Sequence, residues 1–279
     1  MRRTILALAV ALLAVASAAP VAAQNSDGVV RYVRYRHDGD VSYGILQGDR
    51  IREIDGDLFG AHRTTDRWVP LADAKLLPPT DPQKVIAVGL NYQSHLGERD
   101  PAAYPGLFAK YPTSLVGQGD DIVRPPDATN LHYEGEMVLV IGKRCARVTE
   151  AEAPDCIFGI TAGDDVSERD WQANDLQWFR AKGSDTFGPV GPVIARGVNP
   201  DDVLVETRVN GEVRQHQRTT DLIFNTSEIV SYVSRYVTLM PGDLIFTGTP
   251  GSTRPMDDGD VVEVEVEGVG ILHNTVRSR

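Results

Sequence analysis

An apolar run with two glutamates near its start, residues 133–142, constrains the fold more than any other segment of this chain. The run is rich in β-branched side chains and ends in glycine, which predicts a strand. Because side chains alternate along a strand, we expect Glu134 and Glu136 to leave it on the same face. Two carboxylates side by side on an apolar strand repel each other and lose hydration, and a divalent cation would remove both costs.

A third acidic side chain fits the same interpretation. Asp165 lies in the run 162–167, and three carboxylates with room for water and substrate suit Mg²⁺ or Mn²⁺. The competing interpretation is an ordinary solvent-exposed sheet edge, on which alternating glutamates are common. The neighbouring motifs favour the metal, so we predict that Glu134, Glu136 and Asp165 bind it.

The N-terminus predicts export. Two arginines precede an unbroken apolar run over residues 5–16, and small residues follow as far as Ala23. This run is shorter than the roughly 20 apolar residues of a membrane span. We therefore expect a signal peptide over residues 1–23, with an earlier cleavage site or an uncleaved anchor as alternatives. The mature protein would be soluble and periplasmic, without a membrane partner.

Charge and cysteine content narrow the class of protein. The net charge is −11 and no Lys/Arg stripe offsets it, so we expect no nucleic-acid partner. An anionic substrate would need a metal or local cations to reverse the sign inside a pocket. Cys145 and Cys156 lack the spacing of a zinc site. They could pair in an oxidising compartment, but both adjoin apolar strand residues, so we expect two buried free thiols.

The chain divides into two parts of different texture. Residues 28–78 hold short alternating segments joined by turns at 38–40 and 47–49, which predicts a small antiparallel β-domain. The proline-rich segment 78–82 is a stiff linker. Residues 79–279 then alternate strands with few helices, which predicts a mostly-β (α+β) catalytic domain.

Two helices are expected in the second part. Residues 167–179 form the first, with Ser167 as its N-cap. Residues 225–236 form the second, with Asn225 as N-cap and Glu228 completing a capping box.

A motif over residues 89–98 supplies a candidate base. If the chain turns helical after Asn91, His95 and Glu98 stand three residues apart and face each other. A carboxylate beside an imidazole fixes its tautomer and raises its basicity, which suits a histidine that takes a proton from water. A surface His–Glu pair is the plainer alternative. The glycine- and proline-containing segment 97–106 could be a lid.

Further polar side chains follow Asp165. Arg169 and Gln172 stand three residues apart on the first expected helix and would point toward Asp165. Lys182 follows that helix, and beside an enolate it would stabilise the developing oxyanion, although a solvated surface lysine is the plainer interpretation. Thr249 belongs to a Thr-Gly-Thr turn after an apolar strand, where free N–H groups and hydroxyls can hold a carboxylate.

Together these segments resemble the fumarylacetoacetate hydrolase family, specifically its acylpyruvase-like and 2-hydroxyhepta-2,4-diene-1,7-dioate isomerase-like branch. The resemblance covers nearly all of residues 84–276. It rests on ordered motifs over residues 89–98, 132–136, 165–172, 182–189 and 241–250. Each motif is weak alone, and their order makes the likeness specific.

The resemblance implies a rolled, mixed β-sheet with a few short helices behind a small N-terminal β-domain, usually in a homodimer. It implies Glu134, Glu136 and Asp165 as ligands of Mg²⁺ or Mn²⁺. His132 matches a family histidine, and its strand position predicts a hydrogen-bond partner of the site rather than a ligand.

The resemblance also implies roles for the polar side chains. His95 and Glu98 would activate water, and Lys182 would assist as an electrophile. The side chains that would contact the substrate are Arg169, Gln172 and Thr249.

The predicted reaction is hydrolysis of a C–C bond in an acylpyruvate or related 2,4-dioxo acid, through a metal-bound enolate. Isomerisation of 2-hydroxydienoates or decarboxylation of 2-oxo diacids would use the same metal site without activated water. The presence of both His95 and Glu98 favours hydrolysis. A periplasmic oxo-acid or metal-binding protein without turnover is the alternative from another class. Relatives of this kind usually lack a signal peptide, which leaves the physiological substrate open.

Overall fold

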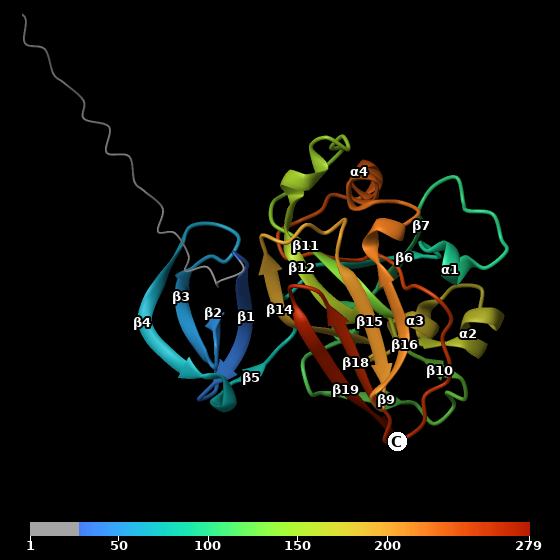
Figure 1. Ribbon diagram of the computed structural model, residues 1–279, viewed down its shortest axis with the longest axis horizontal. Coiled ribbons are helices and arrows are strands. Elements are labelled where there is room, and N and C mark those ends of the chain that lie inside the picture. The colour runs from blue at the N-terminus through green and yellow to red at the C-terminus, as the bar shows by residue number, and fades with distance from the viewer. Residues whose placement is uncertain (1–27) are drawn as a thin grey trace, which may run out of the picture.

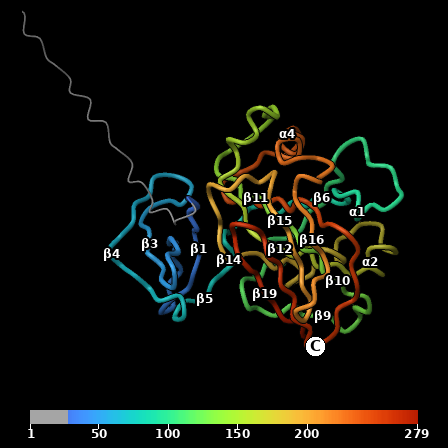
Figure 2. Tube along the Cα trace, in the orientation of Figure 1, coloured from blue at the N-terminus to red at the C-terminus, as the bar shows by residue number. Residues whose placement is uncertain are grey.

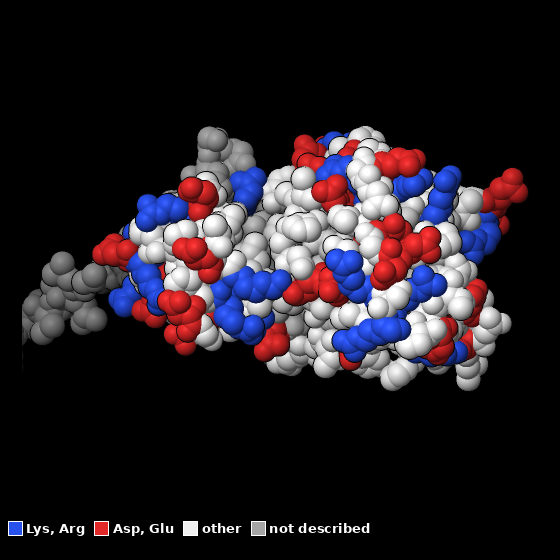
Figure 3. All heavy atoms as spheres, turned by 90° about the horizontal axis from the view of Figure 1, so that it is seen from below, with Lys and Arg blue, Asp and Glu red and all other residues white. Residues whose placement is uncertain are grey.

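A computed structural model describes residues 28–279, and the expected signal peptide lies outside this range. Figure 1 shows a small N-terminal β lobe beside a larger body in which strands outnumber helices. No helix within the described range is both long and apolar enough to cross a membrane. On the face seen in Figure 3, acidic and basic side chains are intermingled.

The N-terminal lobe is an antiparallel sheet. Its strands are β1 (Val30–His37), β2 (Asp40–Gln47), β3 (Arg50–Gly56), β4 (His62–Pro70) and β5 (Lys75–Leu76), with η1 (Leu71–Asp73) before β5. Each strand from β1 to β4 pairs with the next, and β5 pairs with β1. The chain traces in Figures 1 and 2 bring β1 against the larger body, where it pairs with β14. The lobe and the body therefore share one hydrogen-bonded sheet.

That shared sheet is mixed. Its order is β4-β3-β2-β1-β14-β12-β11-β17-β6-β7, and the pair β17–β6 is parallel. The strands of the body are β6 (Val85–Gly89), β7 (Gly106–Lys110), β11 (Gly135–Ile141), β12 (Ile157–Asp164), β14 (Gly188–Arg196) and β17 (Leu244–Phe246), with β8 (Leu115–Val116) against β14. Every residue of β11 is buried, as an apolar central strand requires.

A second sheet packs on the first. Its order is β16-β15-β18-β19-β9, and its strands are β9 (Asp121–Arg124), β15 (Leu204–Val209), β16 (Glu212–Arg218), β18 (Val261–Val266) and β19 (Gly270–Ser278). A side chain at Gly135 would meet Thr207 at 1.9 Å, so glycine lets the sheets approach closely. The short pair β10 (Leu131–His132) and β13 (Ser167–Glu168) completes the predicted mostly-β, rolled architecture.

The helices are short. They are α1 (Gln93–Leu96), α2 (Arg169–Asn174), α3 (Phe179–Gly183) and α4 (Thr226–Tyr236), with the single turns η2 (Pro112–Ser114), η3 (Ala153–Cys156) and η4 (Thr219–Asp221). The capping box predicted for α4 is present, with Asn225 and Glu228 each accepting from the other's backbone N–H.

The prediction of a single helix over residues 167–179 was wrong, because this range contains the short strand β13, the short helix α2 and the first residue of α3. Ser167 pairs with His132 in a strand, and the cap is Glu168, whose carboxylate accepts the N–H of Trp171. The same carboxylate also accepts N–H groups from the facing loop at residues 129–130, which fixes it ahead of the helix. The chain then leaves helical geometry after Asn174 and turns before α3.

The expectation of two free thiols was also wrong, because Cys145 and Cys156 form a disulfide. After β11 the chain makes an excursion and returns through η3 into β12. The return brings the two Cα atoms to 6.2 Å, within the range that a disulfide spans. Both side chains are buried, as the apolar neighbours predicted. Their pairing followed from the path of the chain, which the spacing did not reveal.

Candidate active site

The first site element is a cluster of three carboxylates at the start of the β11–β12 pair. Gly135 faces Asp164 and Glu136 faces Gly163 in this antiparallel register, so the residues flanking the pair lie side by side. Carboxylate oxygens of Glu134, Glu136 and Asp165 lie within 4.8 Å of one another, and all three residues are buried. We call these three side chains the carboxylate floor. The structure brings together the three residues that the sequence singled out as metal ligands.

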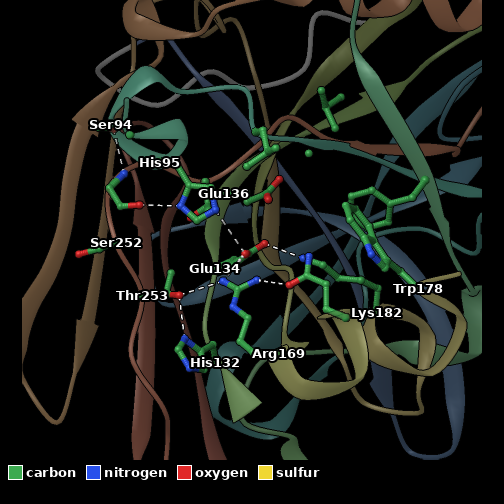
Figure 4. Close-up of a pocket in the computed structure, with 18 of the residues that line it drawn as sticks. Ser94, His95, His132, Glu134, Glu136, Arg169, Trp178, Lys182, Ser252 and Thr253 are labelled. Carbon is green, nitrogen blue, oxygen red and sulfur yellow. Dashed lines mark hydrogen bonds and ion pairs between the residues drawn. The ribbon is translucent and has the colours of Figure 1, made fainter. Parts of the chain in front are cut away.

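Groups of the protein hold the floor in place, and Figure 4 shows two of them, Lys182 and Arg169, beside Glu134. The Lys182 ammonium donates to Glu134 Oε2 at 2.7 Å and to Asp165 Oδ2 at 2.6 Å. Arg169 Nη2 donates to Glu134 Oε1 at 2.5 Å. The Gly248 N–H donates to Glu136 Oε2 at 2.7 Å. The Thr-Gly-Thr turn therefore does hold a carboxylate, and that carboxylate belongs to the protein itself.

Charge is distributed unevenly over the floor. Burial would raise the pKa of Glu134, but Lys182, Arg169 and His95 together hold it below its ordinary value. Burial raises the pKa of Glu136 well above its ordinary value, and the charges of Asp165 and Glu134 raise it further. An added cation nearby would stabilise the charged form of Glu136.

The residues fit a divalent cation. They offer three buried oxygen donors at close range, and hard cations such as Mg²⁺ and Mn²⁺ prefer oxygen ligands. Burial raises the pKa of Glu136, the charges of Asp165 and Glu134 raise it further, and Lys182 offsets this only in part. A bound cation would supply that missing positive charge.

Lys110 is a site residue that the sequence analysis missed. It ends β7, its side chain is fully buried, and its ammonium donates to Asp165 Oδ1 at 2.6 Å and to the Lys182 carbonyl. Burial lowers the pKa of Lys110, and Asp165 opposes that shift. The sequence signal that could have revealed it is a lysine directly after the uncharged segment 106–109, because a charge at the end of such a strand often belongs to a site.

Asp164 is a second residue that was missed. Its Oδ1 accepts the Glu134 N–H at 2.7 Å, which fixes the backbone from which Glu134 projects. Its other oxygen, Oδ2, is buried without a hydrogen-bond partner among the described residues. Burial raises the pKa of Asp164 to about 7.

His95 lies above the floor, and its ring orientation is set by the backbone. Its Nδ1 lies 2.6 Å from the carbonyl oxygen of Gly251, and its Nε2 lies 3.7 Å from Glu134 Oε1. A carbonyl only accepts hydrogen bonds, so Nδ1 carries the proton. In the neutral ring, Nε2 then has a free lone pair and faces the floor.

The structure does not bring Glu98 to His95. The helix α1 ends at Leu96, and Gly97 adopts φ +71°, ψ −131°, so the chain leaves helical geometry before Glu98. Glu98 is exposed and makes no hydrogen bond or ion pair within the described range. It begins the segment that we call the entrance loop, residues 97–105 between α1 and β7. Gly251 supplies the orienting contact that the sequence assigned to Glu98.

Arg169 is fixed on several sides. Besides Glu134, it donates to Gln172 Oε1 at 2.7 Å and to Thr253 Oγ1 at 2.8 Å. Thr253 Oγ1 lies 2.8 Å from His132 Nδ1, and His132 Nε2 lies 2.8 Å from Asn130 Oδ1. Burial and the Arg169 charge lower the pKa of His132 to about 4. His132 therefore supports Arg169 through Thr253, in agreement with its predicted part as a hydrogen-bond partner.

Thr249 is also held by the protein. Its hydroxyl donates to the Gly135 carbonyl at 2.9 Å and accepts from Gln215 at 2.7 Å. With Arg169 and Gln172 it lines a cavity of about 730 Å³ above the floor. All three predicted substrate contacts therefore border the same space, and their contact with substrate stays a prediction. His95 and Lys182 border it as well, whereas Glu98 does not.

Comparison with known proteins agrees with this architecture. The family model for the fumarylacetoacetate (FAA) hydrolase C-terminal domain matches residues 84–277, and the Rv2993c-like N-terminal model matches residues 30–79. The solved 2-hydroxyhepta-2,4-diene-1,7-dioate isomerase of Mycobacterium marinum is 42% identical with a TM-score of 0.84, covering 90% of this chain and 99% of that one.

Two further similar proteins differ in their named reactions. The mitochondrial oxaloacetate tautomerase Fahd2a of Rattus norvegicus is 38% identical over 214 residues, which is 72% of this chain and 68% of that protein. A solved maleylpyruvate hydrolase of Sphingobium sp. SYK-6, in complex with manganese(II) and pyruvate, is 27% identical with a TM-score of 0.74 and covers 89% of this chain and 99% of that one. Similar proteins thus include an isomerase, a tautomerase and a hydrolase.

Proposed function

Because the chain belongs to the fumarylacetoacetate hydrolase family, we propose that it is a divalent-metal-dependent enzyme that transfers a proton at the carbon next to the carbonyl of a 2-oxo acid. This is the chemistry of a tautomerase or isomerase. The observation that carries the proposal is the position of His95, whose Nε2 faces the carboxylate floor while the Gly251 carbonyl fixes its ring through Nδ1.

The residues have distinct parts in this reaction. Glu134, Glu136 and Asp165 would hold Mg²⁺ or Mn²⁺, which supplies Lewis-acid polarisation of the substrate carbonyl. His95 Nε2 takes a proton from C3 of the substrate, and the C–H electron pair becomes the C2=C3 double bond as the carbonyl oxygen gains negative charge. Lys182 donates toward that oxygen. Return of the proton at a different position completes the isomerisation.

Hydrolysis of an acylpyruvate C–C bond is the second candidate. It is favoured by the presence of both His95 and Glu98 and by the likeness to maleylpyruvate hydrolase. Hydrolysis needs a water activated near His95, and we propose that the entrance loop would have to bring Glu98 toward the ring for that step. Decarboxylation of a 2-oxo diacid needs only the metal and Lys182.

A comparison of two variants tests the proposal. In the Mn²⁺-loaded enzyme, His95→Ala should lower deuterium exchange at C3 of a 2-oxo acid by about 10²–10⁴-fold, the usual loss for a general base. Mn²⁺ binding should persist, since the floor is unchanged. Glu98→Gln should leave exchange within about twofold of wild type but lower any acylpyruvate hydrolysis. Exchange that is unaffected by His95→Ala would refute the assignment of the base.

The compartment is a separate proposal. We propose that the protein is exported and cleaved near Gln24. Two features support this: the apolar N-terminal run is typical of a signal peptide, and the Cys145–Cys156 disulfide is typical of proteins in an oxidising compartment. Mass spectrometry of protein from its native host should find a mature N-terminus close to Gln24. An intact Met1 on a cytosolic pool would contradict export. A homodimer, implied by the resemblance, would appear as doubled mass in light scattering.

A further inference from the structure

The cationic side chains around the cavity differ in whether they are already paired. Arg169 and Lys182 both border the cavity, and both donate to Glu134 at 2.5 and 2.7 Å. Lys182 also binds Asp165. Their charge serves chiefly to hold the carboxylate floor. Carboxylates of the protein already neutralise part of both charges, so neither side chain would attract a second anionic group on the substrate strongly.

Arg99 is the exception. It borders the same cavity from the entrance loop, and its Nε donates to the Leu96 carbonyl at 3.0 Å. Within residues 28–279 it forms no ion pair, although the exposed Glu98 and Asp100 flank it in sequence. The hydrogen bond from Nε fixes the guanidinium at the C-terminal end of α1. The two Nη groups form no hydrogen bond within the described range and can donate to a ligand.

Among the described residues that line the cavity, Arg99 is the arginine without a carboxylate partner, since Arg169 pairs with Glu134. Some exposed arginines elsewhere pair with carboxylates, as Arg63 does with Asp55, and others, such as Arg235, form no ion pair within the described range but lie outside the cavity. The net charge of −11 makes such partners plentiful and repels small anions from the molecule as a whole. A free guanidinium beside the cavity is therefore placed where an incoming anion would meet it.

We infer that Arg99 binds a second carboxylate of the substrate, so that the enzyme prefers 2-oxo dicarboxylic acids over 2-oxo monocarboxylic acids. The planar guanidinium offers two parallel N–H donors that match a carboxylate. The 2-oxo acid end of the substrate would face the floor, and the distal carboxylate would face Arg99. This inference rests on the proposed function, and it adds the substrate class and the residue that selects it.

A matched substrate pair tests the inference. Oxaloacetate and 2-oxobutyrate differ only in a terminal carboxylate in place of a methyl group. Tautomerisation of oxaloacetate is followed by its enol absorbance, and deuterium exchange at C3 of 2-oxobutyrate by NMR, both with the Mn²⁺-loaded enzyme. Arg99→Ala should raise KM for oxaloacetate about 10-fold while kcat stays within about twofold, because one charge-assisted contact is lost. Its kcat/KM for 2-oxobutyrate should stay within about twofold.

Two further variants serve as controls. Arg99→Lys keeps the charge but loses the paired donors, so it should recover part of the lost affinity for oxaloacetate. Arg235→Ala removes another exposed arginine that forms no ion pair within the described range and lies on α4 outside the cavity. It should leave both substrates unaffected. If 2-oxobutyrate is too poor a substrate, inhibition by pyruvate replaces it, and its inhibition constant should not change in Arg99→Ala.

The outcomes distinguish a failure of the Arg99 assignment from a failure of the proposed function. Wild-type turnover with equal losses on both substrates in Arg99→Ala, or with no loss on oxaloacetate, overturns the selection by Arg99 and leaves the proposed function standing. Wild-type enzyme that processes 2-oxobutyrate as well as oxaloacetate overturns the dicarboxylate preference. Absence of turnover with either substrate in the presence of Mn²⁺ overturns the proposed function itself.

Discussion

The carboxylate floor and the entrance loop border one cavity but are built on opposite principles. The floor is buried on a central strand pair, and each of its carboxylates is held by at least one N–H donor. The entrance loop is exposed from Gly97 to Tyr104, and the described contacts of its side chains are few. One of them is the stack of Tyr104 on Tyr232, with ring centroids 5.9 Å apart. Under the proposed function, metal binding would be fixed by a buried strand pair, whereas substrate selection would lie on an exposed loop with few contacts.

The largest effect should come from removing a charge beneath the floor. Lys110→Met, measured by urea unfolding with chelator present, should lower the free energy of unfolding by about 3–5 kcal/mol, because it leaves Asp165 with one fewer buried partner. Mn²⁺ should restore part of the loss by replacing the missing charge. Lys143→Met is the control, since its ion pair with Asp155 is exposed, and it should cost less than about 0.5 kcal/mol. Equal small losses in both variants would show that the buried ammonium is not needed.

Next in size is the loss of a proposed metal ligand. Glu136→Gln should weaken Mn²⁺ binding, measured by calorimetry, by more than about 100-fold, since loss of groups that only support ligands already costs 10–100-fold. With chelator present its melting temperature should equal or exceed that of wild type, because the variant removes a carboxylate that its neighbours repel. Glu98→Gln, from the entrance loop, should leave Mn²⁺ affinity unchanged. Similar Mn²⁺ affinities for the two variants would contradict the assignment of metal binding to the floor rather than to the loop.

A third test addresses the scaffold of the floor. The disulfide joins Cys145 and Cys156, which are eleven residues apart in the segment that connects β11 to β12. It lies at the opposite end of these strands from the floor. Reduction, or Cys145→Ala with Cys156→Ala, should lower the free energy of unfolding by about 2–3 kcal/mol, as expected for a loop of that length. Enzyme activity at 25 °C should change little, because the hydrogen-bonded register from Gly135 to Ile141 remains. Loss of Mn²⁺ binding on reduction would show that the floor depends on the distant bridge.

The smallest effect should come from the loop itself. Tyr104→Ala removes the stack on Tyr232 and should lower the free energy of unfolding by less than about 1 kcal/mol, since Tyr104 is exposed. Proteolysis within residues 97–105 should become faster, and Mn²⁺ affinity should not change. Unchanged proteolysis would mean that the stack does not restrain the loop.

The sequence predicted the floor because a strand imposes a strict alternation. The apolar run from Met137 to Ile141 specifies β11, which contains Glu136 and begins at Gly135, directly after Glu134. The alternation that the sequence predicted places the two glutamates two residues apart at the start of this strand. The capping box of α4 was equally local, since Asn225 and Glu228 contact each other within one turn. In both cases the partners are close in sequence, so the local backbone settles the geometry.

Prediction failed where partners are distant in sequence or where one residue ends an element. Gly97 ended α1 before Glu98, and Gly251, far along the chain, took the place beside His95. Glu168 displaced Ser167 as a helix cap because its carboxylate also binds the loop at residues 129–130. These outcomes depend on which loops the fold brings together, and a local pattern carries no information on that.

Local patterns in the sequence were enough to predict the mostly-β fold and the carboxylates of the floor, because alternation along a strand and the cost of buried charge act locally. The packing of distant segments determined which cations hold those carboxylates, that Cys145 and Cys156 pair, and that Arg99 borders the cavity without a carboxylate partner among the described residues. Electrostatic interactions depend on distances through space, and those distances are set when segments far apart in the chain pack together.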